Sequence, residues 1–211
     1  KFIVADFSAI EARVIAWLAD EQWVLDAFAN NKDLYCETAS RMFGVPVEKH
    51  GINGELRQKG KQCTLSCSYG GAKGALIAMG AIDSGMKEDE LQPLVIAWRE
   101  ANPNIVRFWH SLEQCAMKCI KEKTVTKTNR LTFSYEAGFL FIELPSGRRL
   151  AYAKPRIGEN KFGGESITYM GINAQKKWDR LETFGGKIAE NVCQAVARDL
   201  LMYSMQTLSH C

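Results

Sequence analysis

The 211-residue sequence lacks any apolar run long enough to cross a membrane, and it lacks a secretory leader. These two absences predict a cytoplasmic protein with no membrane partner. Its seven cysteines are an odd number, which without a secretory signal favours reduced thiols over a disulfide framework. The chain also opens without methionine and stops abruptly after His210 and Cys211, so we expect it to be a piece of a longer protein.

The sequence also has little net charge, +3 from 27 basic and 24 acidic residues. This balance permits a nucleic-acid partner but does not require one. Apolar residues make up 46% of the chain, ample for a hydrophobic core. No internal repeat or low-complexity segment is present, which excludes repeat and fibrous architectures.

Two cysteine pairs are each spaced by one helical turn, Cys63 with Cys67 and Cys115 with Cys119. A zinc-binding structural module is conceivable if the two pairs converge. CxxxC is a weaker metal signal than CxxC, and the spacing favours small apolar positions of helices.

Apolar periodicity predicts a mostly helical α+β fold. Residues 124–157 are rich in β-branched and aromatic residues, and Pro145-Ser-Gly-Arg148 predicts a hairpin between strands 140–144 and 149–153. Residues 158–172 are rich in glycine and are predicted to be irregular. We predict a final helix over 173–208 with an apolar stripe at Val192, Val196, Leu200 and Tyr203. The other predicted helices begin after Ser8 and cover parts of 20–45, 55–68, 72–81, 88–99 and 105–123. Within 20–45, the second helix is predicted to begin at Asp33 and to end at Gly44.

The first thirteen residues form one candidate site. Residues 2–5 predict a buried strand, and Asp6 follows it. Ser8 and Glu11 stand at the spacing of a capping box, which would begin a helix that buries Ile10, Val14, Ile15 and Leu18. A carboxylate at a strand-to-helix turn suits a hard cation. From these residues alone, a simple turn cap is the easier interpretation of Asp6.

A second candidate site consists of four residues spaced four positions apart, Arg57, Lys61, Leu65 and Tyr69. This spacing predicts that they lie on one face of a single helix. The two cations lie near the helix N-terminus, where unpaired N–H groups favour anions, so they could clamp a triphosphate. Leu65 and Tyr69 offer surface on which a base could stack. A solvated charged face and a core tyrosine are the alternative interpretations.

These motifs resemble those of the family A DNA polymerases. Asp6-Phe-Ser-Ala-Ile-Glu-Ala-Arg13 is similar to motif A, and the stretch from Arg57 through Lys61 to Tyr69-Gly70 is similar to motif B. Residues 190–199 resemble the glutamine-containing helix that follows the primer–template. The resemblance covers the whole chain and is strongest to bacteriophage and prophage polymerases, through residues 154–157, 167–169 and 145–147.

The resemblance implies a DNA-directed DNA polymerase that adds dNTPs to a primer 3′-hydroxyl with two Mg²⁺ ions. Asp6 would bind both ions, assisted by the Phe7 carbonyl. Arg57 and Lys61 would hold the triphosphate, with Lys61 also placed to protonate the pyrophosphate. Asp6 and Lys61 are the implied catalytic residues. The implied nucleotide-binding residues are Phe7, Ser8, Glu11, Tyr35, Arg57, Lys61 and Leu65.

The resemblance also implies contacts with the sugar and with primer–template DNA. Glu11 would be the steric gate that excludes a ribose 2′-hydroxyl. Tyr69 would occupy or border the position of the templating base in the open state, and Gly70 is a further implied DNA-binding residue. Gln194 would hydrogen-bond to the duplex near the primer end, with Arg198 one turn further along the helix.

Several positions depart from the family pattern. Leu65 replaces an aromatic residue, so the handling of dideoxynucleotides is not carried over, and Tyr35 stands where many relatives have histidine. Phe7 and Ala9 replace polar residues. No His-Asp pair occurs, although motif C of the family supplies the second metal-binding carboxylate through His-Asp-Glu, which family spacing places just beyond Cys211.

We therefore expect a monomeric palm–fingers fragment from a bacterial or phage-infected cell. Residues 1–18 and 171–211 would be palm, and 19–170 would be fingers with the β-rich insert at about 124–157. We expect the fragment alone to be inactive. One alternative is a single-subunit RNA polymerase, against which Glu11 argues because a ribonucleotide enzyme needs a small residue there. Another is a noncatalytic nucleotide- or DNA-binding module, which Asp6→Ala would leave functional.

Overall fold

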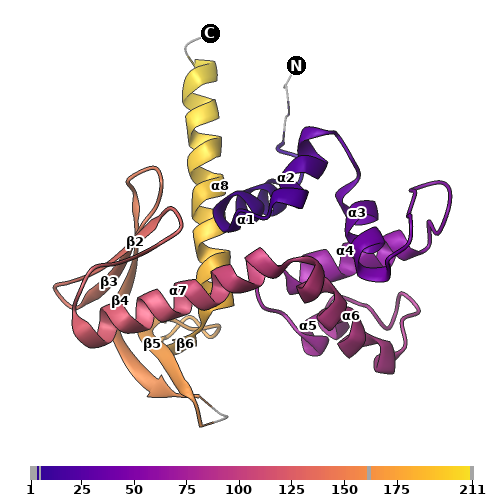
Figure 1. The fold of residues 1–211 in the computed structure, drawn as a ribbon. Helices are drawn as coiled ribbons and strands as arrows, with labels where there is room; N and C mark the ends of the chain where they lie inside the picture. Colours follow the sequence, from indigo (N-terminus) through magenta and orange to yellow (C-terminus); the bar gives the residue numbers. More distant parts are fainter. Residues whose placement is uncertain (1–3, 5, 161–162, 210–211) are drawn as a thin grey trace. The chain divides into compact units, whose positions relative to one another are not determined.

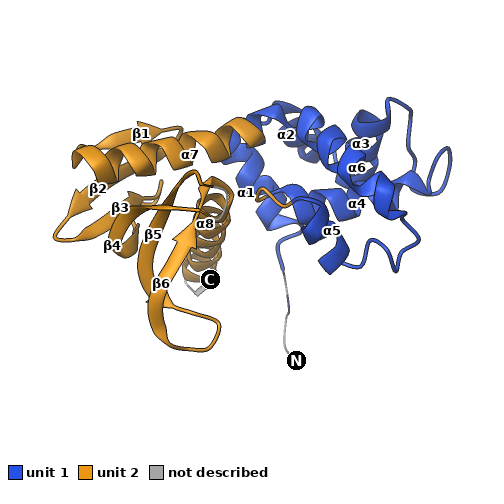
Figure 2. Ribbon diagram, turned by 90° about the horizontal axis from the view of Figure 1, so that it is seen from below, with its two compact units in different colours: residues 1–68, 72–105 blue, residues 69–71, 106–211 orange. Residues whose placement is uncertain are grey.

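The structure, a computed structural model, describes residue 4 and residues 6–160 and 163–209. Its α+β fold confirms the predicted class: seven helices precede six strands, and an eighth helix ends the described chain (Figure 1). The strand predicted over residues 2–5 lies outside the described residues except for Val4, which is exposed and irregular. The chain divides into two compact units (Figure 2), unit 1 with residues 1–68 and 72–105 and unit 2 with residues 69–71 and 106–211.

Within its described residues, unit 1 has helices as its only regular structure. Asp33 caps the third helix by accepting hydrogen bonds from two backbone N–H groups, and Gly44 ends that helix with a positive φ of 68° that glycine adopts without strain. Both boundaries were predicted from the sequence. The helices are α1 (Ile10–Ala19), α2 (Gln22–Ala29), α3 (Leu34–Phe43), α4 (Leu56–Cys67), α5 (Lys73–Ala78) and α6 (Glu88–Ala101).

Helix α1, which begins within motif A, buries its predicted face only in part. Val14, Ile15 and Leu18 are buried, whereas Ile10 is partly exposed. The predicted capping box is wrong: Ala9 is the N-cap, at a left-handed φ of 50°, and no side chain caps the helix. The reason is a tight turn, in which the Ser8 carbonyl accepts a hydrogen bond of 2.9 Å from Arg13 Nε.

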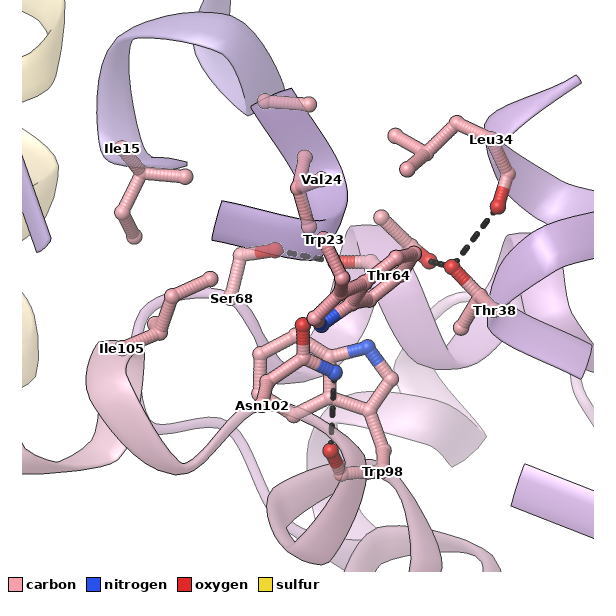
Figure 3. A pocket seen from close by; sticks show the side chains of 11 residues that line it. Ile15, Trp23, Val24, Leu34, Thr38, Thr64, Ser68, Trp98, Asn102 and Ile105 are labelled. Atoms are coloured by element: carbon pink, nitrogen blue, oxygen red, sulfur yellow. Dashed lines mark hydrogen bonds between the residues drawn. The ribbon is translucent and has the colours of Figure 1, made fainter. Parts of the chain in front are cut away.

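The centre of unit 1 is closely packed around two tryptophans. Trp23, Trp98 and their neighbours, drawn in Figure 3, surround a void of about 10 Å³, which is at the lower limit of the size that holds one water. Polar groups around it are paired locally, as where Asn102 donates to the Trp98 carbonyl at 2.9 Å and Thr38 donates to the Leu34 carbonyl at 2.8 Å. Such a filled core gives α1, α3 and α4 fixed positions relative to one another.

Two close contacts fix particular elements of unit 1. A β-carbon on Gly60 would lie 2.5 Å from the Tyr35 carbonyl oxygen, so the glycine lets α4 approach the first turn of α3. Glu21 is buried, and its carboxylate accepts hydrogen bonds from the backbone N–H groups of Asn104 at 2.9 Å and Ile105 at 3.2 Å. Glu21 therefore caps the helix that begins at Pro103 from a distant part of the chain.

Unit 2 contains a six-stranded antiparallel sheet in sequential order with two long helices. Lys121 of α7 forms an ion pair of 2.7 Å with Glu165 of the sheet, and Asn191 of α8 donates to the Tyr152 hydroxyl at 2.8 Å. The first three residues of α7 belong to unit 1. The elements are α7 (Pro103–Glu122), β1 (Thr126–Thr128), β2 (Leu131–Glu136), β3 (Phe139–Glu143), β4 (Arg149–Glu159), β5 (Glu165–Ile172), β6 (Trp178–Thr183) and α8 (Gly185–Ser209).

The predicted hairpin is confirmed, but the extent of the sheet is not. Strands β3 and β4 pair with Leu140 opposite Tyr152 around the 145–148 turn. Residues 158–172 were predicted to be irregular, yet they include β5, and residues 178–183 form β6 where a helix was predicted. The final helix begins at Gly185, not at 173. The prediction failed because glycine and polar residues in these strands hide the alternation that identifies a strand.

The apolar stripe of the final helix, α8, is buried at one end of the helix and exposed at the other. Val192 and Val196 of the predicted stripe are buried, whereas Leu200 and Tyr203 are 44% and 71% exposed. The stripe is therefore a packed face only in its first half.

Within the described residues, no helix combines the length and hydropathy that spanning a membrane requires.

The four cysteines of the two CxxxC spacings lie on helices, as predicted. Cys63 and Cys67 lie buried in α4, and Cys119 is buried in α7, where Cys115 is partly exposed. Within the part of the chain that the structure describes, no three His, Cys, Asp or Glu side chains gather as a metal site would require. The described thiols therefore pack as small side chains of helices.

Candidate functional site

A cleft of about 450 Å³ in unit 1 is the candidate nucleotide site. It lies between the turn before α1, the first turn of α3 and the first turn of α4. Three of the predicted nucleotide-binding residues line it together: Ser8, Tyr35 and Arg57. The close approach of α4 to α3 at Gly60 brings Arg57 to the N-terminus of α3.

Three cations and one carboxylate surround this cleft. Arg13 and Lys32 join Arg57 as lining residues, and Asp33 is the acidic one. The Arg13 guanidinium lies 4.0 Å from the centre of the Phe28 ring, which holds it against α2. The cleft therefore carries an excess of positive charge, as a site for an anion would.

Arg57 is held by an ion pair with Asp33. Its Nε and Nη2 atoms lie 3.0 and 2.9 Å from Asp33 Oδ2, and its guanidinium carbon lies 5.3 Å from the centre of the Tyr35 ring. Burial alone would raise the pKa of Asp33, but hydrogen bonds from Arg57 and from the Cys36 N–H hold that pKa below its usual range. The same pair raises the pKa of Arg57. Both groups are charged at neutral pH.

The other motif A residues lie outside the lining of this cleft. Asp6, Phe7 and Glu11 are exposed, and none of them is among the lining residues. An exposed carboxylate next to a backbone carbonyl offers the hard oxygen ligands that Mg²⁺ takes, usually from one or two carboxylates together with substrate phosphates. Asp6 and the Phe7 carbonyl thus fit one part of a magnesium site.

The predicted motif B face is only partly formed. Lys61 and Leu65 follow Arg57 on α4, Lys61 half-buried and Leu65 46% exposed, and neither lines the cleft. A step of four residues turns about 40° round the helix, which carries the later positions away from Arg57. Tyr69 was predicted to lie on this helix, and that prediction is wrong, because α4 ends at Cys67 and residues 68–70 form a turn.

The predicted DNA-binding residues all belong to unit 2. Gly70 has a φ of 80°, and the Tyr69 carbonyl lies against Gly186 in the first turn of α8. Gln194 and Arg198 are exposed one turn apart on the same helix. The turn after α4 and the α8 helix are therefore joined within one unit, because a side chain at Gly186 would collide with the turn.

Reasoning from the sequence missed Arg13, Lys32 and Asp33 as residues of the cleft. Asp33 was recognised as the start of a helix, and its N-cap position was a usable signal for fixed side-chain geometry. No spacing rule joins it to Arg57, which lies 24 residues further along the chain. Arg13 belongs to the motif A pattern, but that pattern does not show which residues share a cavity.

The chain was compared with known families and proteins. A family model described as DNA polymerase family A matches residues 1–208. The chain belongs to DNA polymerase family A. This membership confirms the resemblance that the three sequence motifs carried.

Two relatives of this chain are themselves DNA polymerases. A DNA polymerase of Bacillus phage SP02 is 51% identical over all of this chain and 33% of its own length. DNA polymerase I of Rhizobium leguminosarum is 44% identical over 33% of the chain and 7% of its own length. A solved POL domain of Pol1 from M. smegmatis, in complex with DNA primer-template and dNTP, has a TM-score of 0.47 at 20% identity and covers 70% of this chain and 21% of its own. The chain thus spans about a third of the phage relative.

Proposed function

We propose that these 211 residues act within a longer DNA-directed DNA polymerase and bind the incoming dNTP in the cleft beside Arg57. Membership of DNA polymerase family A carries the proposal. The cleft supports it, because Arg13, Lys32 and Arg57 surround a space of about 450 Å³ with excess positive charge. A triphosphate is the part of a dNTP that such a site attracts.

In this proposal the chain's own residues divide the work of nucleotidyl transfer. Arg57 and Lys61 bind the triphosphate, and Lys61 gives a proton to the departing pyrophosphate. Glu11 excludes the ribose 2′-hydroxyl. Asp6 and the Phe7 carbonyl hold Mg²⁺, which when bound lowers the pKa of the primer 3′-hydroxyl and neutralises phosphate charge. Ser8 and Tyr35 line the nucleotide cleft, and Leu65 contacts the nucleotide from further along α4, outside the cleft lining.

The DNA side of the proposal belongs to unit 2. Tyr69 and Gly70 border the templating base, and Gln194 and Arg198 contact the primer–template duplex from α8. Exposure of Gln194 and Arg198 supports this role, because both side chains are accessible to a large ligand. Residues 1–18 and 171–211 are palm in this proposal, and the residues between them are fingers.

The first test is Asp6→Asn in the whole polymerase. The substitution keeps the side chain's shape and removes the charge that Mg²⁺ needs, so primer extension should fall by at least on the order of a hundredfold. Primer extension with labelled dNTP, read by gel, measures the loss. Affinity for primer–template DNA, measured in the same preparation, should stay unchanged.

Asp89→Asn is the matched control, because Asp89 is an exposed carboxylate on α6 away from the cleft. It should retain full activity. Full activity of Asp6→Asn would contradict the proposal and favour a noncatalytic nucleotide- or DNA-binding module.

A further inference from the structure

The two carboxylate oxygens of Asp33 have separate partners. Oδ1 accepts hydrogen bonds from the backbone N–H groups of Tyr35 at 3.0 Å and Cys36 at 3.1 Å, which caps α3. Oδ2 accepts from Nε and Nη2 of Arg57 at 3.0 and 2.9 Å. Because the cap fixes the carboxylate to the backbone, the oxygen that meets Arg57 is fixed as well.

This pairing uses one edge of the guanidinium group. Nε and Nη2 form the side edge, and both are directed at a single oxygen of Asp33. The end edge, with one N–H of Nη1 and the second N–H of Nη2, remains for another acceptor. Neither contact with Asp33 uses Nη1. The Cys36 thiol also lies near the guanidinium group and contributes to the raised pKa of Arg57. A phosphate takes two parallel N–H groups from such an edge.

The surroundings hold Arg57 in this arrangement. The Tyr35 ring lies 5.3 Å from its guanidinium carbon, and both side chains line the cleft. Gly60, one turn after Arg57, keeps α4 close to the Tyr35 backbone. An arginine otherwise has many rotamers, so each of these contacts reduces the freedom that an anion would have to remove on binding.

We propose that Asp33 is a positioning residue, which fixes Arg57 by its side edge so that the end edge can bind the dNTP triphosphate. The inference rests on the proposed dNTP site and adds a residue that does not touch the nucleotide. The competing physical effect is that Asp33 attracts the guanidinium and repels phosphate. In our proposal the gain from a fixed Arg57 exceeds that repulsion. Lys32 pairs with Glu37 at 3.2 Å, but Arg13 adds a further cation, so the cleft stays positive.

The test separates the two tasks of Asp33 by substitution in the whole polymerase. Asp33→Asn keeps a good helix cap but turns an N–H group or a neutral oxygen toward Arg57, so the ion pair is lost. Asp33→Glu keeps the charge within reach of Arg57 but is a poor cap. We expect Asp33→Asn to raise KM for dNTP about tenfold with kcat little changed. Its thermal unfolding midpoint should fall only slightly, by the loss of one partly exposed ion pair.

Asp33→Glu should show the opposite pattern. Its KM should lie closer to the unmodified value, because the carboxylate can still pair with Arg57, while its unfolding midpoint should fall. A purely structural role of Asp33 would instead make KM follow the unfolding midpoint in both variants. An unchanged or lower KM in Asp33→Asn would overturn the proposal, since it would mean that Asp33 only repels phosphate.

Arg57→Ala distinguishes failure of this inference from failure of the proposed site. If Arg57→Ala leaves KM for dNTP unchanged, the proposed dNTP site itself is wrong. If Arg57→Ala raises KM and Asp33→Asn does not, only the positioning role is wrong. The double variant should have the KM of Arg57→Ala alone, because Asp33 is proposed to act only through Arg57.

Discussion

Glu11 is a single residue at which the chemistry of the substrate can be tested. It is exposed in the first turn of α1, five residues after Asp6. As a sugar gate, its carboxylate would occupy the space that a ribose 2′-hydroxyl needs. Glu11→Ala should therefore raise the kcat/KM for NTPs relative to dNTPs by about a hundredfold, the scale of a steric filter. Single-nucleotide incorporation with each substrate measures this ratio.

The unmodified polymerase provides the reference for that ratio. Efficient use of dNTP by Glu11→Ala would show that the variant remains folded and competent. A preference of the unmodified polymerase for NTPs would contradict the gate and favour the single-subunit RNA polymerase alternative.

At the residue scale, the sequence predicted which side chains to consider but not how each is held. Ser8 and Glu11 had the spacing of a capping box, yet the chain turns at Ala9 with a positive φ, and Arg13 takes the Ser8 carbonyl. Such a turn depends on backbone angles that residue types alone do not specify. The ion pair between Asp33 and Arg57 was beyond prediction because only the packing of α3 on α4 brings the two together.

At the scale of elements, one carboxylate joins the β3–β4 turn to α8. Asp199 accepts hydrogen bonds from the Ser146 hydroxyl at 2.6 Å and Arg148 Nε at 2.7 Å, and Arg148 also donates to the Ala195 carbonyl at 2.8 Å. Burial alone would raise the pKa of Asp199, but these hydrogen bonds and the Arg148 charge hold it below its usual range. The contact fixes the turn to the helix that carries Gln194 and Arg198.

Asp199→Asn should lower the free energy of unfolding by about 1 kcal/mol at neutral pH, the value for a partly exposed charged hydrogen bond. Because the pKa is lower in the folded state, this contribution is complete above the carboxyl's ordinary pKa of 3.8 and disappears as pH falls through the folded value. Urea unfolding of both proteins, from about pH 7 to about pH 2, should show the difference shrinking on acidification.

Glu143→Gln is the control for that series, because Glu143 is an exposed carboxylate at the end of β3. Its stability should stay close to that of the unmodified protein at every pH. A difference for Asp199→Asn that persists unchanged at the acid end would show that lost packing, and not the charge, is responsible.

Elements with strong periodicity were predicted well, and those that depend on partners were not. The helices of unit 1 follow from apolar residues repeating every three or four positions, with Asp33 and Gly44 as boundaries. Strand β4 continues past a bulge between Ala153 and Arg156, where Lys154 has a φ of 45°. Beyond it, β5 and β6 exist because each pairs along the sheet, and local sequence carries little of that information.

At the scale of the whole molecule, the proposed function gives this chain only part of what nucleotidyl transfer needs. The phage SP02 polymerase that it resembles at 51% identity is about three times as long. Within the described residues, no three carboxylates, histidines or cysteines gather at one point, and the 211-residue sequence contains no His-Asp pair. Two Mg²⁺ ions held close together repel each other, and one carboxylate is too little negative charge to balance them.

The purified 211-residue chain should therefore fail to extend a primer, even though its helices and sheet are formed. Primer extension with Mg²⁺ and all four dNTPs should give no product above the level of its own Asp6→Asn variant. Circular dichroism on the same sample should show helix, so that inactivity is not mistaken for unfolding. Binding of dNTP to the purified chain should still be detectable by calorimetry, because all residues that line the cleft beside Arg57 belong to unit 1. Template-dependent incorporation at a rate comparable to that of a whole polymerase would contradict this prediction. It would show that Asp6 needs no second carboxylate to hold the Mg²⁺ ions.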